Sequence, residues 1–258
     1  MTGLHQKIVL VTGGSGDLGR TLTRAFVDQG ACVIITSRNE ARLKAATAEI
    51  GSSRRVLALP CDVTQRESVE ALQSTIERLA GTVQVLINNA GLAQAMAFLE
   101  MADSLWDEIL KTNLTGSHNC CKAFLPGMIA SGWGRIINIG STMAKVAYSH
   151  VSAYAASKHG LLGLTRALAL ETARWGVTVN AICPGYVANE RTRENARRMA
   201  QKSGKRVEDV LSMFANSSPQ KRLIDPNEVA GLALMLASET ASGITGQAIN
   251  VDGGAVMV

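Results

Sequence analysis

Hydrophobic and polar positions along this chain form two alternating kinds of segment. Short apolar runs rich in β-branched residues predict buried strands, and they lie at residues 7–12, 31–36, 56–59, 83–88, 135–140, 177–182 and 247–251. Longer amphipathic stretches predict helices, and they lie at residues 17–29, 40–50, 66–80, 105–130, 151–175 and 226–237. Asp225 is the predicted N-cap of the last helix, directly before a proline. This alternation is typical of an α/β fold with a doubly wound, seven-stranded parallel sheet and helices on both faces.

One segment interrupts the alternation. Residues 188–218 are polar and basic, and they separate the sixth predicted strand from the last predicted helix. Ligands in open α/β sheets bind outside the carboxyl ends of the strands, so we expect this segment to cover the binding crevice as a lid. Because the chain has no internal repeat and no linker, we expect a single domain spanning residues 1–258.

Composition narrows the possible functions. Of the 258 residues, 47% are hydrophobic and 18% charged, which suits a packed core rather than a disordered chain. The net charge of +5 is spread along the chain, so it does not indicate nucleic-acid binding. The sequence has no signal-type apolar region and no run of about 18 apolar residues, so we expect a cytoplasmic protein without a membrane partner. Five cysteines without a C-x-x-C pair argue against disulfides and a zinc site, and we expect reduced core thiols and no metal.

The first predicted strand leads into a glycine-rich loop at residues 12–19 and then into a helix. Gly14, Gly16 and Gly19 fit the pattern G-x-G-x-x-G. Such glycines let the backbone turn sharply and approach a diphosphate, which the free N–H groups of the helix N-terminus hold. A strand before the motif and a helix after it are the context that the motif requires. We therefore predict a dinucleotide site here.

The end of the second predicted strand bears on the choice of cofactor. Enzymes that use NAD usually carry a carboxylate there for the ribose 2′-hydroxyl, whereas this chain has Ser37 and Arg38. A guanidinium in place of the acid favours NADP(H) over NAD(H), although a lone arginine is also compatible with a solvated loop cation. Asp62, after the third strand, is placed to bind an adenine amino group or to cap the next helix.

A second group of residues indicates proton transfer. Tyr154 and Lys158 are four residues apart in a predicted helix, so their side chains share one face. A phenol titrates near 10, and an ammonium about 5 Å away favours the phenolate by about two pKa units. Ser141 ends the fifth predicted strand, where its hydroxyl is placed to bond a substrate carbonyl oxygen. We therefore expect an unusually acidic Tyr154 phenol beside Ser141.

Seven motifs in order resemble those of the short-chain dehydrogenase/reductase family, and in particular its ketoreductases, over essentially the whole chain. They are the loop at residues 12–19, the sequence NNAG at 88–91, Asn113, Ser141, Tyr154-x-x-x-Lys158, the sequence PG at 184–185 and VDGG at 251–254. The resemblance implies a Rossmann-like fold in which Ser141 orients the substrate and Tyr154 is the general acid in reduction and the general base in oxidation. It also implies that Lys158 lowers the pKa of Tyr154 and binds the nicotinamide ribose, and that Asn113 anchors a water.

Motifs and resemblance together predict a set of cofactor-binding residues. The set is Gly13, Ser15, Gly16, Asp17, Leu18, Ser37, Arg38, Asp62, Val63, Asn89, Ala90, Gly91, Tyr154, Lys158, Pro184, Gly185, Val187 and Asn189. Two members depart from the family pattern. Asp17 replaces a glycine of the phosphate loop, and we expect its carboxylate to point away from the phosphates. Asn189 replaces a threonine that commonly holds the carboxamide, a role that an amide can also fill.

The predicted substrate pocket is mainly apolar. Its walls are Leu92, Gln94, Met96, Met143, His150, Val151, Tyr186, Met213 and Phe214. Adaptable methionines suit a ketone with an apolar body better than a sugar. Met143 and Val151 fall where 3-hydroxybutyrate dehydrogenases carry polar or cationic groups, so a short free keto acid is disfavoured. His150 lies one turn before Tyr154, where it either reaches the substrate or plays a structural part.

The predicted lid is strongly basic. Residues 189–206 carry seven cations, Arg191, Arg193, Arg197, Arg198, Lys202, Lys205 and Arg206, against two acids. Such a rim attracts the phosphates of coenzyme A or an acidic acyl carrier protein, and the alternative is a solvated helical face.

Taken together, the sequence predicts an NADPH-dependent oxidoreductase that reduces a 3-oxoacyl thioester or similar apolar ketone. The alternatives are a dehydrogenase of secondary alcohols, polyols or sugars and, from another class, a cofactor-bound regulator with vestigial chemistry. By resemblance, the helices at 105–130 and 151–175 pack across two-fold axes in a homotetramer.

Overall fold

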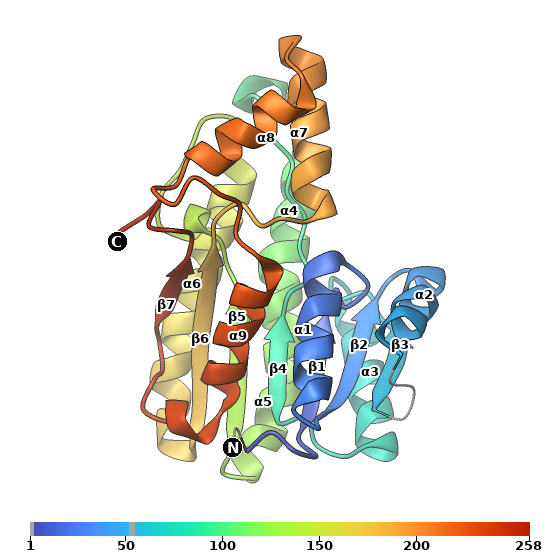
Figure 1. Cartoon of the computed structure of the whole chain (residues 1–258). Coiled ribbons are helices and arrows are strands. Elements are labelled where there is room, and N and C mark those ends of the chain that lie inside the picture. Colours follow the sequence, from blue (N-terminus) through green and yellow to red (C-terminus); the bar gives the residue numbers. More distant parts are fainter. Residues whose placement is uncertain (1–2, 52–54) are drawn as a thin grey trace.

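A seven-stranded parallel sheet forms the centre of the molecule (Figure 1). The computed structural model describes residues 3–51 and 55–258. The strands are β1 (Ile8–Thr12), β2 (Cys32–Ser37), β3 (Val56–Pro60), β4 (Val85–Asn88), β5 (Gly134–Ile139), β6 (Val177–Pro184) and β7 (Ala248–Val251). Their order in the sheet is β3-β2-β1-β4-β5-β6-β7, with every neighbouring pair parallel. All seven predicted strands are confirmed, with ends shifted by at most two residues.

Helices cover both faces of this sheet, as predicted. They are α1 (Asp17–Asp28), α2 (Glu40–Ile50), α3 (Arg66–Leu79), α4 (Asp103–Leu110), α5 (Gly116–Ala130), α6 (Ser152–Thr172), α7 (Glu190–Ser203), α8 (Val207–Asn216) and α9 (Pro226–Ala237). Shorter 3₁₀ turns lie at Phe98–Glu100, Thr142–Ala144, Ala173–Trp175 and Glu239–Ala241. Side chains of α1, α2 and α9 pack on one face of the sheet, and those of α3, α5 and α6 pack on the other. In α1, the spacing of Leu22 and Phe26 places both on the buried side.

The stretch predicted as one helix at residues 105–130 is divided in the structure. It consists of α4, a π-helical turn at Lys111–Thr115, and α5. The π turn contains the fully buried Asn113. Insertions of this kind are rare and recur at functional sites.

The predicted lid contains two helices that the sequence analysis did not assign. In Figure 1, α7 and α8 stand beyond the ends of the strands, and Gly204 with a φ of 69° ends α7. Their small apolar contact, built from Ala196, Ala200 and Val210, is flanked by charged positions. Both helices are amphipathic, but α7 is strongly polar, so the segment was interpreted from its polar and basic composition and no helix was assigned there.

The start of α9 and the cysteines are as predicted. The Asp225 side chain accepts a hydrogen bond from the Asn227 N–H, and with Glu228 it forms a capping box at α9. All five cysteines are free, four of them buried and Cys32 half-buried. Among the described residues, none of the helices is long and apolar enough to cross a membrane.

Candidate active site

The glycine-rich loop packs too tightly for side chains. Gly13 has a φ of 64°, and a Cβ there would lie 2.9 Å from the Cα of Ala90. A Cβ on Gly19 would lie 2.4 Å from the carbonyl oxygen of Gly13. Gly16 caps α1 without a side-chain hydrogen bond, so the N–H groups of the first helical turn have no side-chain acceptor at the cap. The loop therefore fits a dinucleotide diphosphate, as the sequence predicts.

The loop after β4 is tied to this glycine-rich loop. The Thr12 hydroxyl accepts hydrogen bonds from the backbone N–H groups of Asn89 and Ala90, both at 3.0 Å. The Asn89 amide donates back to the carbonyl oxygens of Thr12 and Gly13. Because these bonds join the carboxyl ends of adjacent strands, they bring two predicted cofactor-binding segments together. The sequence analysis gave Thr12 no role, although its place at the end of β1 is a usable signal.

The predicted residues at the ends of β2 and β3 have different surroundings. Arg38 is exposed, and within the described part of the chain it has no hydrogen-bond or ion-pair partner. The Asp62 carboxylate accepts bonds from the N–H and hydroxyl of Thr64, at 3.0 and 2.8 Å. Helix α3 begins at Arg66 without a side-chain cap. The alternative in which Asp62 caps that helix is therefore wrong, because its oxygen is used in a local turn. Val63 is buried and packs against Gly116.

Ser141, Tyr154 and Lys158 meet at the carboxyl end of β5. The Lys158 ammonium is buried, donates to the Ile139 carbonyl oxygen at 2.7 Å and lies 5.8 Å from the centre of the Tyr154 ring. Ser141 accepts from the Met143 N–H at 3.1 Å and is hydrogen-bonded to the Tyr154 hydroxyl. The i, i+4 spacing on α6 thus brings the phenol and the ammonium into one site with the strand-end serine.

The pKa of Tyr154 is shifted in the direction opposite to the sequence-based expectation. Burial raises the pKa of Tyr154 above its ordinary value, and the hydrogen bond with Ser141 and the charge of Arg191 lower it by less. Burial, followed by the charge of Arg191, lowers the pKa of Lys158 to about 7. The expected lowering of the Tyr154 pKa by Lys158 is therefore not found. The reason is that desolvation disfavours the charged form of both groups.

Asn113 joins three segments around Lys158. Its side chain accepts from the Leu92 N–H at 2.7 Å and donates to the Leu92 carbonyl oxygen and the Ser157 hydroxyl, both at 2.9 Å. A Cβ on Gly91 would lie 3.3 Å from the Asn113 side-chain oxygen and 3.9 Å from the Lys158 nitrogen. Asn113 thus lies beside the buried lysine. Ser157, which the sequence analysis overlooked, completes its hydrogen bonding.

The predicted substrate residues have unequal exposure. Met143 is buried, and Gln94, Met96 and Val151 are half-buried. Tyr186 and Phe214 stack with ring centres 4.3 Å apart and line one recess together. Met213 is exposed. His150 is also exposed, with a φ of 66°, and its carbonyl oxygen accepts from the Met96 N–H.

The segment after β6 holds the last predicted cofactor residues. Gly185, which follows Pro184, donates its N–H to the Val251 carbonyl oxygen, and Val187 forms a bridge with Ile224. The Asn189 side-chain oxygen caps α7 by accepting from the Thr192 N–H at 2.9 Å. Only the amide nitrogen of Asn189 therefore remains as a side-chain donor for a ligand.

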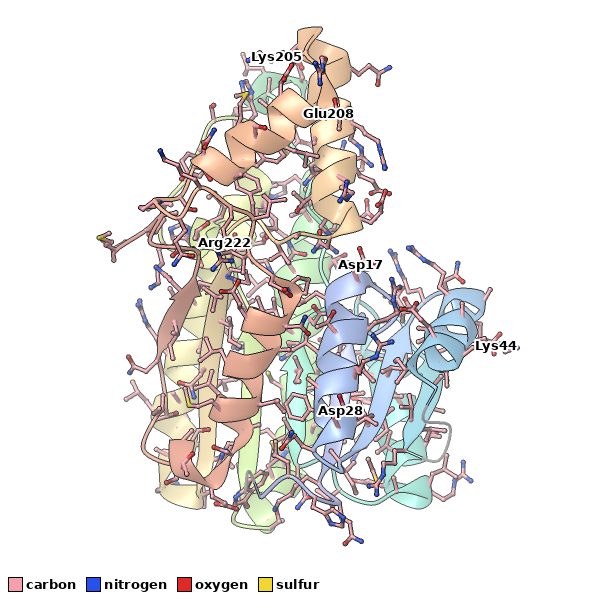
Figure 2. All side chains as sticks on the ribbon, in the orientation of Figure 1. Asp17, Asp28, Lys44, Lys205, Glu208 and Arg222 are labelled. Carbon is pink, nitrogen blue, oxygen red and sulfur yellow. The ribbon has the colours of Figure 1, made fainter. Side chains whose placement is uncertain are left out.

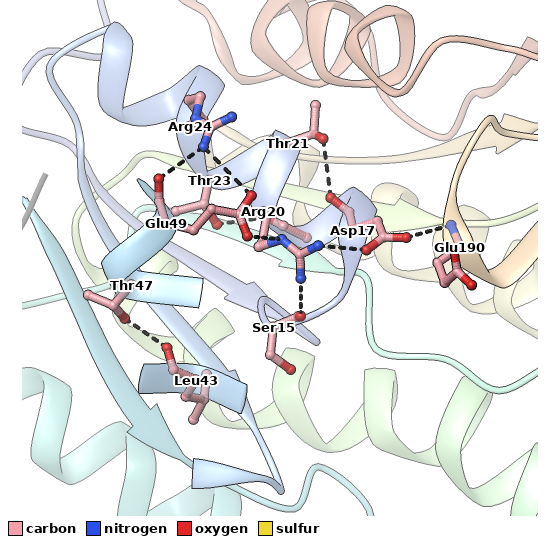
Figure 3. A network of polar contacts seen from close by, with 11 residues as sticks. Ser15, Asp17, Arg20, Thr21, Thr23, Arg24, Leu43, Thr47, Glu49 and Glu190 are labelled. Atoms are coloured by element: carbon pink, nitrogen blue, oxygen red, sulfur yellow. Dashed lines mark hydrogen bonds and ion pairs between the residues drawn. The ribbon is translucent and has the colours of Figure 1, made fainter. Parts of the chain in front are cut away.

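Two side chains link the start of α7 with these loops. Arg191 donates from its guanidinium to the Gly91 carbonyl oxygen at 2.8 Å. The Asp17 carboxylate accepts from Arg20 at 2.7 Å and from the Glu190 N–H at 2.6 Å (Figure 3). The sequence analysis counted Arg191 only as a lid cation, because the direction of its side chain depends on a helix that the sequence pattern did not reveal.

The same fold and motifs occur in proteins of known class. Residues 7–200 match the family described as short chain dehydrogenase. A 3-oxoacyl-acyl-carrier-protein reductase of Vibrio harveyi is 37% identical over 99% of both chains. A D-beta-hydroxybutyrate dehydrogenase of Cupriavidus necator is 36% identical over 97% of this chain and 98% of its own. A putative ketoacyl reductase of the granaticin polyketide synthase from Streptomyces violaceoruber is 39% identical over 96% of this chain and 92% of its own.

A solved structure agrees with this class. The crystal structure of a variant of actinorhodin polyketide ketoreductase with NADPH superposes with a TM-score of 0.94, at 35% identity and 99% coverage of each chain. The protein belongs to the short-chain dehydrogenase/reductase family, the NAD(P)-dependent oxidoreductases that act on CH–OH groups and the corresponding ketones.

Proposed function

We propose that this protein is an NADPH-dependent ketoreductase that reduces a 3-oxoacyl thioester, or a similar apolar ketone, to a secondary alcohol. The observation that carries the proposal is the Tyr154 phenol beside Ser141, with its pKa raised by burial. A phenol with a raised pKa is protonated at neutral pH, as a general acid in reduction must be.

The dinucleotide, when bound, supplies a hydride to the carbonyl carbon. The Ser141 hydroxyl holds the substrate carbonyl oxygen beside Tyr154, which transfers its phenolic proton to that oxygen. Lys158 binds the nicotinamide ribose and returns a proton to Tyr154, and Asn113 anchors a water on the path from Lys158 to solvent. These roles follow the family resemblance. The places of the four residues support them, because Lys158 lies 5.8 Å from the centre of the Tyr154 ring, Ser141 is hydrogen-bonded to Tyr154, and Asn113 bonds Ser157, the residue directly before Lys158.

NADP(H) is the cofactor that the residues favour. Arg38 is exposed at the end of β2 and free to bind a 2′-phosphate, with no carboxylate at this position to repel it. The remaining cofactor residues proposed from the sequence lie at the end of β2, in the loops after β1, β3, β4 and β6, at the start of α1 and on α6. Asn189 contributes its amide nitrogen only, since its oxygen caps α7.

The proposed substrate class follows from the apolar walls. Met143, Val151 and the stacked pair Tyr186 and Phe214 offer no fixed charge for a short keto acid. Relatives include reductases of 3-oxoacyl thioesters, and the cationic α7 suits a thioester of coenzyme A or an acyl carrier protein. We further propose that the chain works as one catalytic domain with residues 188–218 as its substrate lid. Figure 2 shows Lys205 at the tip of that segment, far from Asp17 at its base.

The test is the rate of NADPH oxidation with a 3-oxoacyl thioester, with acetoacetate and, in reverse, with a panel of alcohols and polyols. We expect the thioester to be reduced fastest, with a larger kcat/KM for NADPH than for NADH. Tyr154→Phe should lower kcat by about 10²–10⁴-fold because it removes the proton donor, a much larger factor than its effect on the Kd of NADPH. A Tyr154→Phe variant that keeps its turnover contradicts the proposal. Faster polyol oxidation supports the alcohol dehydrogenase instead, and dinucleotide binding without turnover supports the regulator.

A further inference from the structure

Two hydrogen bonds fix the start of α7 to the two loops that the proposed function assigns to the dinucleotide. The Glu190 N–H donates to the Asp17 carboxylate on the glycine-rich loop side, and the Arg191 guanidinium donates to the Gly91 carbonyl oxygen on the β4 side. These partners are about 100 or more residues apart in sequence. The start of α7 therefore bridges both loops.

The Asp17 carboxylate is held in place by Arg20 as well as by α7. Arg20 binds one oxygen of its carboxylate at 2.7 Å, and the same guanidinium also donates to the Ser15 carbonyl oxygen at 2.8 Å and pairs with Glu49 at 3.1 Å (Figure 3). The second Asp17 oxygen accepts from the Glu190 N–H. The acidic side chain that replaces a family glycine thus anchors the residue directly before Arg191.

Arg191 carries a charge without a carboxylate partner in the described part of the chain, because its one hydrogen bond goes to a neutral carbonyl oxygen. The Gly91 backbone that it contacts also borders the Lys158 nitrogen. The charge of Arg191 lowers the pKa of Lys158 and of Tyr154, so the guanidinium lies close enough to act on both. Two cations therefore approach each other, and among the residues that the structure describes no carboxylate forms an ion pair with either of them.

We propose that Arg191 binds the diphosphate of the dinucleotide and that Asp17 positions it by holding the start of α7. A guanidinium presents a planar fork of donors that matches phosphate oxygens. A bound diphosphate would compensate the charge of Arg191, whose hydrogen bond goes to a neutral carbonyl oxygen. This inference rests on the proposed function for its ligand, but it assigns a new residue and a new role to the lid.

The test compares dissociation constants of NADPH and NADH, measured by quenching of dinucleotide fluorescence. The diphosphate is common to both cofactors, so Arg191→Gln should raise the dissociation constants of NADPH and NADH by a similar factor of about ten or more. Arg191→Lys should recover part of the loss, because lysine binds phosphate as a point charge. The matched control is Arg193→Gln, which removes the same charge from an exposed position of α7. Within the described residues the Arg193 side chain makes no hydrogen bond or ion pair with either loop, so this variant should bind both cofactors like the unmodified protein.

Other outcomes overturn the inference in distinguishable ways. Weaker binding of NADPH alone would place Arg191 at the 2′-phosphate, and a higher KM for the ketone alone would place it at a substrate anion. Unchanged or tighter binding of both cofactors in Arg191→Gln would exclude the contact. If the unmodified protein binds neither cofactor, the proposed function falls and this inference with it. Asp17→Ala should weaken the binding of both cofactors when Arg191 is present, but not in the Arg191→Gln background. An equal loss of binding in the two backgrounds would exclude the positioning role of Asp17.

Discussion

At the scale of single residues, Lys158 is a buried group whose protonation a bound dinucleotide should change. Its pKa is lowered to about 7, first by burial and then by the charge of Arg191. A negatively charged dinucleotide next to it favours the ammonium and raises that pKa. The complex then binds more protons than the free protein between pH 7 and the new pKa. Binding must therefore weaken as pH rises above 7.

We predict that NADPH binding at pH 7.5 takes up protons. Calorimetric titrations in two buffers with different ionisation enthalpies should give different heats, and the Kd should rise with pH above 7. Lys158→Met removes the titrating group, so its heats should agree between the buffers. Equal heats for the unmodified protein would show that Lys158 does not change its protonation state on binding.

The site shows which residue properties a sequence conveys. Ser141, Tyr154 and Lys158 meet as predicted because strand ends and the i, i+4 spacing are local features. The pKa of Tyr154 moves in the opposite direction from the prediction. Desolvation depends on how distant segments cover the phenol, and spacing along the chain does not reveal that.

At the scale of elements, helix bounds were predictable even where amphipathicity is weak, as at α9, whose start is marked in the sequence by Asp225 and Pro226. The bounds of α2 and α9 agree with the predicted ranges. The helix predicted at 105–130 contains a π-helical turn instead of running continuously. The sequence did not reveal this turn, because the apolar pattern continues across it. Helices α7 and α8 were missed although both are amphipathic, because the segment was interpreted from its polar and basic composition.

The capping box of α9 gives an element-scale prediction. Asp225 accepts from the Asn227 N–H at 2.8 Å, and Glu228 accepts from the Asp225 N–H at 2.9 Å. Asp225→Ala leaves the Asn227 N–H at the start of α9 without its side-chain acceptor, so the free energy of unfolding should fall by about 1 kcal/mol. Urea unfolding monitored by circular dichroism measures this change. Asp225→Asn keeps a side-chain acceptor, so its free energy of unfolding should fall much less. Equal decreases in the two variants would contradict a capping role.

At the scale of the whole molecule, the outer side of α5 and α6 is more apolar than a solvent-facing surface requires. A groove between these helices is lined by Leu125, Pro126, Ile129, Leu164 and Leu168, together with His118, Cys121 and Lys122. Leu170 on α6 is 86% exposed. These are the helices that the family resemblance places across two-fold axes. Extended apolar surfaces of this kind are typical of subunit interfaces.

We therefore predict a homotetramer in which α5 and α6 pack against the same helices of another subunit. Light scattering at micromolar concentration should give four times the mass of the chain.

A Leu164→Glu, Leu168→Glu double variant places two charges in the groove and should shift the mass to a smaller species, because desolvating unpaired carboxylates opposes association. Met235→Glu, on the opposite face of the sheet in α9, adds an acid at an exposed position and should leave the mass unchanged. A monomer in the unmodified protein contradicts the prediction. A tetramer that persists in the double variant places the interface on other helices, because this groove cannot bury two carboxylates from each subunit without a partner charge for each.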